Sequence, residues 1–163
     1  TELLTKSKNE SNIDCILYKP IRLKNFLSNI EESINEINNV FSFFQDPMEK
    51  IEQLIDYGKM ASGISEDLKV DENKIVGCTS MAWVICKNDN ERVAISTDSE
   101  SYIVRGLLHL LEKILNNRTK DEILSIEAGS ILNNIGLGNN ITSQRTNGFL
   151  SAVSKIQNQI QKI

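Results

Sequence analysis

Hydrophobic residues follow a helical period in the first and last thirds of the chain and a strand-like pattern in the middle. The first run recurs at steps of three and four residues, as one face of a helix requires, at Leu23, Leu27, Ile30, Ile34, Ile37 and Phe41. This spacing leaves open whether the helix is continuous from Pro20 or starts near Ile30. A second helix is predicted to start at Asp46-Pro47, an N-cap followed by a proline suited to the first turn, and to end at Gly63.

Three short segments in the middle of the chain have the composition of β-strands. Residues 74–76 are a short apolar piece, residues 81–86 follow a polar break, and residues 92–96 alternate as a half-buried strand does. Residues 87–90 are predicted to form the turn between the last two strands. The short connections favour an antiparallel meander.

Helices are predicted again after the strands. Asp98 or Ser99 is expected to cap a helix, Thr119 and Glu122 match a capping box, and Thr142 is expected to cap the last helix. Helices, then a small sheet, then helices indicate the α+β class. Residues 1–27 are predicted to be a flexible N-terminal segment, because residues 1–19 are polar and lack apolar periodicity, and residues 28–163 to be one domain.

Charge and composition exclude several functions. Hydrophobic residues make up 40% and charged residues 25% of the 163 residues, as in ordinary globular proteins, and no apolar run approaches the ~18 residues of a membrane span. The net charge is −4 and the pI about 5.1. No stripe of Lys and Arg is present, so nucleic acid and anionic membranes are not expected partners.

Three cysteines and one histidine limit the chemistry that the chain can perform. An odd number of widely spaced cysteines forms no disulfide framework and favours a reducing compartment, and no set of zinc ligands is visible. We therefore predict no metal site and no resident cofactor. His109 shares a polar helical stripe that is predicted to face solvent, with Arg105, Glu112, Lys113 and Asn116. Without a positioned histidine, the Cys–His and Ser–His–Asp schemes lack their general base.

Cys78 is the candidate functional residue. It follows Gly77 in a polar break between two predicted strands, where a tight loop can lift a side chain off the sheet. Cys86 lies within an apolar strand and is predicted to be structural, and Cys15 lies in the polar segment. A thiol without a base can still exchange sulfur, because a thiolate needs only a suitable pKa and access to attack an electrophilic sulfur.

Arg145 and Asp98 are the supporting candidates. If Thr142 caps the last helix, Arg145 falls in its first turn, where a cation meets the positive end of the helix dipole at a cost of about 0.3–1 kcal/mol. Asp98, or the thiolate or persulfide of Cys78, would compensate for this charge. Alternatively, the arginine bonds loop carbonyls or extends into water, and Asp98 only caps a helix.

Four stretches of the sequence resemble the SufE family of sulfur acceptors. Residues 68–83, which contain Gly-Cys-Thr-Ser-Met-Ala-Trp, resemble the signature Gly-Cys-x-Ser-x-Val-Trp and the residues before it, and residues 98–107 resemble the Asp-Ser-Asp…Lys/Arg-Gly-Leu segment. Residues 135–137 and 141–149 resemble the terminal Gly-Leu…Leu-(Thr/Ser)-Pro-Ser-Arg-x-x-Gly block. The resemblance extends from about Ile30 to the C-terminus. The departures are Ala82 for Val, Glu100 for Asp and the missing Pro before Arg145.

The resemblance implies a fold and a function. The fold is a three-stranded antiparallel sheet packed against several helices, shared with the IscU-like scaffolds. Cys78 would accept persulfide sulfur from a PLP-dependent cysteine desulfurase of the SufS type, enhance its activity and pass the sulfur to a SufBCD-type assembly complex. The protein would then be a sulfur-transfer protein rather than an enzyme, and a monomer by default. The wording of residues 70–78 resembles plastid-type members, so the apicoplast stroma is the expected location, with a bacterial cytoplasm as the alternative.

Two other functions stay open at this point. An iron–sulfur scaffold on the related fold would need three converging cysteine-like ligands, and an allosteric adaptor would stimulate the desulfurase without carrying sulfur. In the sulfur-transfer mechanism, Met81 and Trp83 are expected to shelter the Cys78 thiol until docking exposes it. Arg145 and Asp98 would shape the loop or hold the thiolate.

Overall fold

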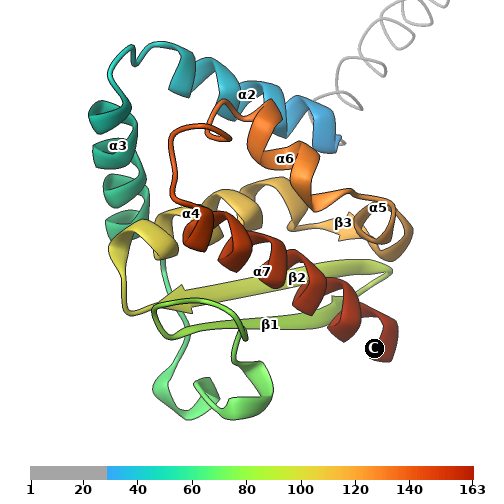
Figure 1. The fold of residues 1–163 in the computed structure, drawn as a ribbon. Coiled ribbons are helices and arrows are strands. Elements are labelled where there is room, and N and C mark those ends of the chain that lie inside the picture. Colours follow the sequence, from blue (N-terminus) through green and yellow to red (C-terminus); the bar gives the residue numbers. More distant parts are fainter. Residues whose placement is uncertain (1–28) are drawn as a thin grey trace, which may run out of the picture.

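The described chain has the predicted order of helices, a small sheet and further helices. The computed structural model describes residues 29–163, so the predictions for Cys15 and for a flexible segment at residues 1–27 lie outside the described residues. The elements shown in Figure 1 are α2 (Ile30–Ser42), α3 (Pro47–Met60), β1 (Ala82–Asp89), β2 (Arg92–Ser99), α4 (Tyr102–Leu115), β3 (Arg118–Thr119), α5 (Lys120–Leu124), α6 (Ala128–Asn134) and α7 (Ser143–Lys162). Two 3-10 turns, Glu66–Leu68 and Asp71–Asn73, lie between α3 and β1. The α+β class is confirmed. Within residues 29–163, no helix combines the length and apolar character that crossing a bilayer requires.

Helix α2 begins at Ile30, where the sequence pattern left the start open. The Asn29 side chain accepts the Glu32 N–H at 2.8 Å and so caps the first turn. Ile37 and Phe41 are buried, so the predicted apolar face of this helix does face the core.

Helix α3 has the predicted start but ends earlier than predicted. The Asp46 carboxylate accepts the Met48 N–H at 2.9 Å, and a proline occupies the first helical position. The predicted end at Gly63 is wrong, because the chain is already extended at Ala61 (φ −65°, ψ 137°). Gly63 lies in the following loop with φ +72°.

The sheet is a long hairpin with a very short third strand. β1 and β2 pair antiparallel from Ala82↔Ser99 to Asp89↔Arg92. The turn contains only Asn90 and Glu91, which have φ values of 48° and 70°, as two-residue hairpin turns require. The prediction of a turn at residues 87–90 is therefore wrong, because the two strands continue past the core to a tighter turn.

The third strand is not the one that the sequence predicted. β3 pairs with Arg92 and Val93 and gives the strand order β1-β2-β3. The predicted strand at residues 74–76 contributes only one isolated bridge, between Lys74 and Trp83. It cannot continue along β1, because Gly77, with φ +95°, turns the chain away. A three-stranded antiparallel sheet is thus confirmed, with a different third strand.

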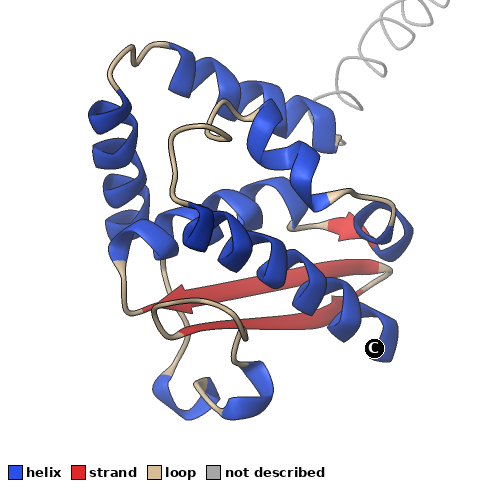
Figure 2. Cartoon of the chain, in the orientation of Figure 1, coloured by secondary structure: helices blue, strands red, loops and turns tan. Residues whose placement is uncertain are grey.

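Helix α4 lies at the centre of the hydrophobic core and buries Leu107, Leu108, Leu110, Leu111, Ile114 and Leu115. It crosses α3 at Gly58 and Gly106, where a Cβ on either glycine would collide with a carbonyl oxygen of the other helix. Figure 1 shows α4 and α7 over the same side of the β1–β2 hairpin, and Figure 2 shows the loop with the two 3-10 turns at the other side. The N-terminal half of α7 is thereby placed over the start of β1.

Side chains from the helices satisfy the backbone groups at the edges of the sheet. On β1, Gln159 of α7 accepts the Cys86 N–H at 2.9 Å and donates to the Val84 carbonyl at 3.0 Å. On β2 beyond β3, Asn116 of α4 accepts the Ile95 N–H at 3.0 Å. These amides act as short substitutes for a neighbouring strand.

The polar stripe of α4 is solvated only in part. The sequence prediction is confirmed for Lys113 and Asn116, which are exposed, and wrong for Arg105, His109 and Glu112, which are partly buried. Glu112 accepts both the N–H and the hydroxyl of Thr97. The His109 side chain is only 17% exposed, its Nδ1 lies 3.6 Å from Glu112, and its ring centroid lies 6.2 Å from that of Tyr57. Burial lowers the pKa of His109. The partly buried members of the stripe contact β2 and α3. They reach β2 because β3 is too short to cover its whole edge.

Candidate functional site around Cys78

Cys78 lies on a short loop whose ends are held together. The Ile75 N–H donates to the Ala82 carbonyl at 2.8 Å and closes the loop of residues 76–81 just before β1. Gly77 takes a left-handed conformation, which glycine adopts without steric cost. The turn directs the Cys78 side chain away from the sheet and toward α7, where its Sγ faces Gly148.

The far end of this loop is fixed to the end of β2, whereas its tip is not. The Met81 carbonyl accepts the Ser99 hydroxyl at 2.9 Å and the Glu100 N–H at 3.1 Å. In the described chain, no hydrogen bond of ordinary geometry involves residues 76–80. Packing alone therefore holds the tip that carries Cys78.

A pocket of about 210 Å³ lies beside the Cys78 thiol, between the loop, α4 and α7. Its apolar part consists of Val104, Leu107, Leu108 and Phe149, and its polar part of Thr79, Ser80, Ser101, Thr142, Gln144 and Arg145. The expectation that Met81 and Trp83 shelter the thiol is wrong. Neither lines the pocket: Met81 is 43% exposed, and Trp83 packs under Lys69, whose Nζ lies 5.3 Å from the ring centroid.

Gly148 faces the Cys78 thiol, and the sequence did not assign it a role. A Cβ at Gly148 would lie only 2.9 Å from the Cys78 Sγ, so a side chain there is incompatible with the present position of the thiol. The available signal was the spacing of three residues from Arg145, which places both on one face of α7.

Burial raises the pKa of the Cys78 thiol above its ordinary value of 9.0. Removal from water disfavours the charged thiolate. In this position the group is half-buried and protonated at neutral pH, and thus a poor nucleophile.

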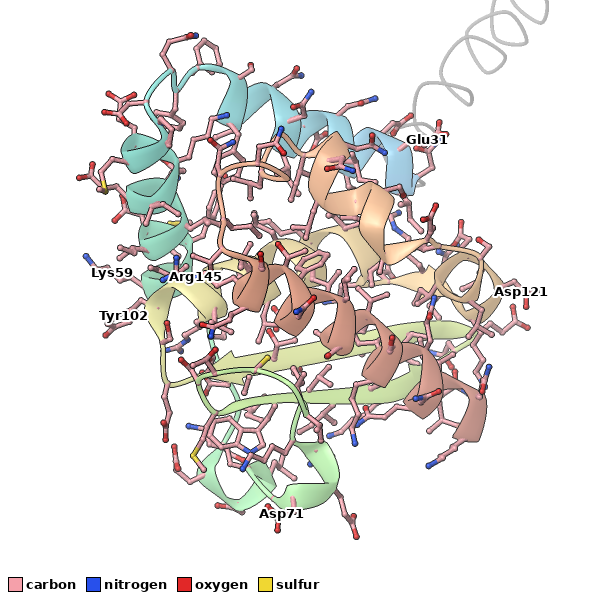
Figure 3. All side chains as sticks on the ribbon, viewed as in Figure 1. Glu31, Lys59, Asp71, Tyr102, Asp121 and Arg145 are labelled. Atoms are coloured by element: carbon pink, nitrogen blue, oxygen red, sulfur yellow. The ribbon has the colours of Figure 1, made fainter. Side chains whose placement is uncertain are left out.

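Arg145 lines the same pocket as Cys78 and lies in the first turn of α7, the position that the sequence predicted. Thr142 is the N-cap of α7, and its hydroxyl accepts the Arg145 N–H at 3.4 Å. Arg145 has no carboxylate partner within 4.0 Å among residues 29–163. Figure 3 shows its side chain at the N-terminal end of α7, on the side of the molecule where Tyr102 begins α4. A cation and a helix N-terminus thus lie at the mouth of the thiol pocket.

Asp98 lies at the end of β2 and does not line this pocket. Its carboxylate pairs with Lys69 at 3.3 Å and with Arg105 at 3.2 Å, and it accepts the Ile64 N–H at 3.2 Å and the Ser99 N–H at 2.8 Å. Burial alone would raise the pKa of Asp98, but these hydrogen bonds and the Arg105 charge outweigh it and lower the pKa.

Helix α4 starts two to three residues later than predicted. Neither Asp98 nor Ser99 caps this helix, since its N-cap is Ser101. Asp98 instead ties the loop after α3 to β2 and α4.

Cys86 is more deeply buried than Cys78 and lies within a strand. It is 8% exposed, its N–H is bonded to Gln159, and burial raises its pKa to about 12. It lies in the core of β1, as the sequence indicated.

Comparison with known protein families gives the assignment. The family model described as "SufE: Fe-S metabolism associated domain" matches residues 35–160. The chain belongs to the SufE family. Family membership assigns it a general role in iron–sulfur metabolism.

Individual relatives and one solved structure agree with this. "SufE-like protein 1, chloroplastic/mitochondrial" of Arabidopsis thaliana is 38% identical over 136 residues, which are 80% of this chain and 36% of that protein. "Cysteine desulfuration protein SufE" of Wigglesworthia glossinidia brevipalpis is 30% identical over 125 residues, or 76% of this chain and 85% of the relative. The solution structure of a hypothetical protein from Thermus thermophilus has a TM-score of 0.66 at 16% identity, covering 80% of this chain and 94% of that one. This solved structure supports the fold.

The described part of this SufE chain contains no group of three or more His, Cys, Asp or Glu side chains arranged to hold a metal ion. A cluster scaffold on this fold would need such a group. Of the residues that the sequence singled out, Cys78 and Arg145 line one pocket, Asp98 lies outside it, and Cys86 is buried elsewhere in β1.

Proposed function

We propose that this SufE protein accepts sulfur on Cys78 from the persulfide of a SufS-type, PLP-dependent cysteine desulfurase and passes it to a SufBCD-type cluster-assembly complex. Removal of the persulfide frees the desulfurase and so enhances its activity. The protein acts as a carrier rather than an enzyme, as a monomer and without a resident cofactor. The similarity to the cysteine desulfuration protein of Wigglesworthia supports this role.

The transfer step needs no external oxidant or reductant. The Cys78 thiolate attacks the terminal sulfur of the desulfurase persulfide, the S–S bond of the donor breaks, and a new S–S bond forms on Cys78. The donor cysteine leaves as a thiolate and takes up the proton that Cys78 lost. One sulfur atom has then moved with no net change in oxidation state.

The observation that carries the proposal is the position of Cys78 on a loop that is tied at its ends and free of hydrogen bonds at its tip. Such a tip can swing out when a partner docks and return afterwards. In the resting position the pocket limits oxidation of the thiol, because only accessible thiolates are readily oxidised.

Arg145 and Asp98 act in support of Cys78 in this scheme. Arg145 and the N-terminus of α7 stabilise the negative charge of the thiolate or persulfide at the pocket mouth. Asp98 acts from a distance as a positioning residue, because Ser99 and Glu100, which directly follow it, hold the Met81 end of the loop.

The proposed location is the plastid stroma, of the apicoplast type, with a bacterial cytoplasm as the alternative. Relatives named as chloroplastic or mitochondrial and relatives from bacteria both match this chain, and the resemblance of residues 70–78 to plastid-type members favours the first.

Mass spectrometry after incubation with the desulfurase and cysteine tests the proposal. Cys78 should gain one sulfur atom, Cys78→Ala should gain none at that position, and Cys86→Ala should behave as the wild type. Full stimulation of the desulfurase by Cys78→Ala would instead identify an allosteric adaptor. Equal loss of transfer in both single variants would contradict the assignment to Cys78.

A further inference from the structure

A second hollow lies next to the cysteine loop, along α7. It has a volume of about 390 Å³ and is lined by Val76, Leu150, Ser151, Ser154, Lys155 and Asn158. All but Val76 belong to one stripe of α7, so the hollow is a groove along the outside of this helix. Figure 1 shows α7 at the front of the molecule, with no other element in front of it.

The groove is continuous with the cysteine loop. Val76 stands two residues before Cys78 and is 82% exposed, although valine is an apolar residue. At Gly77 a Cβ would lie 3.0 Å from the Ser151 hydroxyl, so the loop rests directly on the helix stripe that forms the groove. A molecule that delivers sulfur to Cys78 can therefore contact these residues as it approaches the loop.

The charge of α7 contrasts with that of the whole chain. The helix contains Arg145, Lys155 and Lys162 but neither Asp nor Glu, whereas the protein has a net charge of −4. Lys155 lines the groove together with Val76, and Arg145 lines the thiol pocket together with Cys78. Each hollow that the cysteine loop borders thus contains a cation, which favours an acidic partner surface.

We infer that the groove of Val76, Leu150 and Lys155 is the docking site for an acidic surface segment of the sulfur-donating desulfurase. Val76 and Leu150 provide the apolar contact, and Lys155 the charge complement. The inference rests on the proposed function, since it names the surface through which the donor reaches Cys78. Seating a segment beside Val76 also pushes on the loop from outside, at the point where Gly77 touches Ser151.

Binding and sulfur transfer are measured separately to test this. The full-length chain is titrated against the SufS-type desulfurase of the same organism by calorimetry at low and high salt, and transfer to Cys78 is followed by mass spectrometry with two donors, the desulfurase and glutathione persulfide. The variants are Lys155→Glu and Val76→Ser. The control is Lys113→Glu, which makes the same charge change at an exposed position on α4.

Each groove variant should weaken binding to the desulfurase about fivefold, because an interfacial charge or apolar anchor contributes on the order of 1 kcal/mol. Lys155→Glu should also reduce the salt dependence of binding. Both variants should take sulfur from glutathione persulfide at the wild-type rate, and Lys113→Glu should resemble the wild type throughout.

Wild-type affinity in both groove variants would overturn the docking site, and so would an absence of wild-type binding. If the wild type binds the desulfurase but Cys78 gains sulfur from neither donor, the proposed function is wrong. The docking site is tested separately, because Lys155→Glu should still bind the desulfurase more weakly than the wild type does. A dimer of this chain that Lys155→Glu disrupts, together with unchanged desulfurase binding, would assign the groove to a second copy and overturn the inference.

Discussion

Replacing Gly148 by alanine tests directly whether α7 holds the Cys78 thiol in its pocket. The new Cβ would lie 2.9 Å from the Cys78 Sγ and 3.7 Å from its Cα. Heavy atoms in contact are optimally separated by about 3.5–4 Å. The thiol and the new methyl group therefore cannot both keep their places, and the part of the structure that lacks hydrogen bonds, the loop tip, should move.

The expected increase in the outward population of the loop depends on whether each free-energy contribution acts on the inward position, the outward position or both. One extra methyl group in a packed site costs about 1–3 kcal/mol, and this strain exists only while the thiol is inside the pocket. Alanine in place of glycine within a helix gains about 0.5–1 kcal/mol whether the loop is in or out. Since about 1.4 kcal/mol corresponds to a factor of ten, the outward population should rise at least about fivefold, with the whole protein little destabilised.

The assay is the rate of Cys78 alkylation by iodoacetamide at neutral pH, followed on the Cys78 peptide by mass spectrometry. Gly148→Ala should react at least about fivefold faster than the wild type. Gly129→Ala is the matched control, because a Cβ there would meet only the Glu127 carboxylate at 3.8 Å. If Gly148→Ala is folded and its Cys78 reacts no faster than in the control, the thiol is not held by this contact and the reasoning is wrong.

Three further predictions concern the framework of the site. Asp98→Asn removes the anion between two cationic partners and should lower the free energy of unfolding in urea by about 2–4 kcal/mol, whereas Asp89→Asn at the exposed hairpin end should change it by less than about 0.5 kcal/mol. Gln159→Leu leaves two backbone groups of β1 without partners and should cost about 2–3 kcal/mol, unlike Gln161→Leu at an exposed position; equal stability of the two leucine variants would refute the edge-capping role. The Cys86 thiol has a pKa of about 12 in the folded protein and near 9.0 in the unfolded chain. Between these two pH values the unfolded chain loses the proton and the folded protein keeps it, so the free energy of unfolding should fall by up to about 1.4 kcal/mol per pH unit. Urea titrations of Cys86→Ala should lack this part of the alkaline loss of stability.

Features of the fold that depend on neighbouring residues could be predicted from the sequence. The caps of α3 and α7 are examples, since Asp46 and Thr142 satisfy N–H groups only two or three residues away. The exposed polar turn at Gly77 singled out Cys78 for the same reason. Arg145 was found because its conflict with the helix dipole is also local.

Features that depend on distant parts of the chain could not be predicted in this way. The third strand has only two residues, Arg118 and Thr119, and carries no strand pattern of its own. It exists because β2 offers it a free edge. Likewise, the α4 stripe was predicted to be solvated from its polarity alone. Glu112 and Asn116 accept backbone N–H groups of β2, and no local pattern indicates that.

The shelter of the thiol was missed for a related reason. Met81 and Trp83 were expected to cover Cys78 because they are close in sequence, but alternation along β1 and the turn at Gly77 direct them elsewhere. The cover comes from α4 and α7, and it includes Gly148, whose contribution is the absence of a side chain. A glycine inside a helix is a weak sequence signal without knowledge of what it faces.

The reactivity of the Cys78 thiol depends on its location, and this makes a single cysteine suitable for the proposed transfer. Inside the pocket, burial raises its pKa and keeps it protonated, so small electrophiles and oxidants meet a poor nucleophile. In the proposed outward position, water would lower the cost of the thiolate, and Arg145, which lines the same pocket, is the cation available to favour the charge. No additional base is then required: the contact that moves the loop also produces the reactive form. In the proposed scheme the outward state is favoured only while a partner occupies the surface beside Val76, which would confine sulfur exchange to partners that fit that surface.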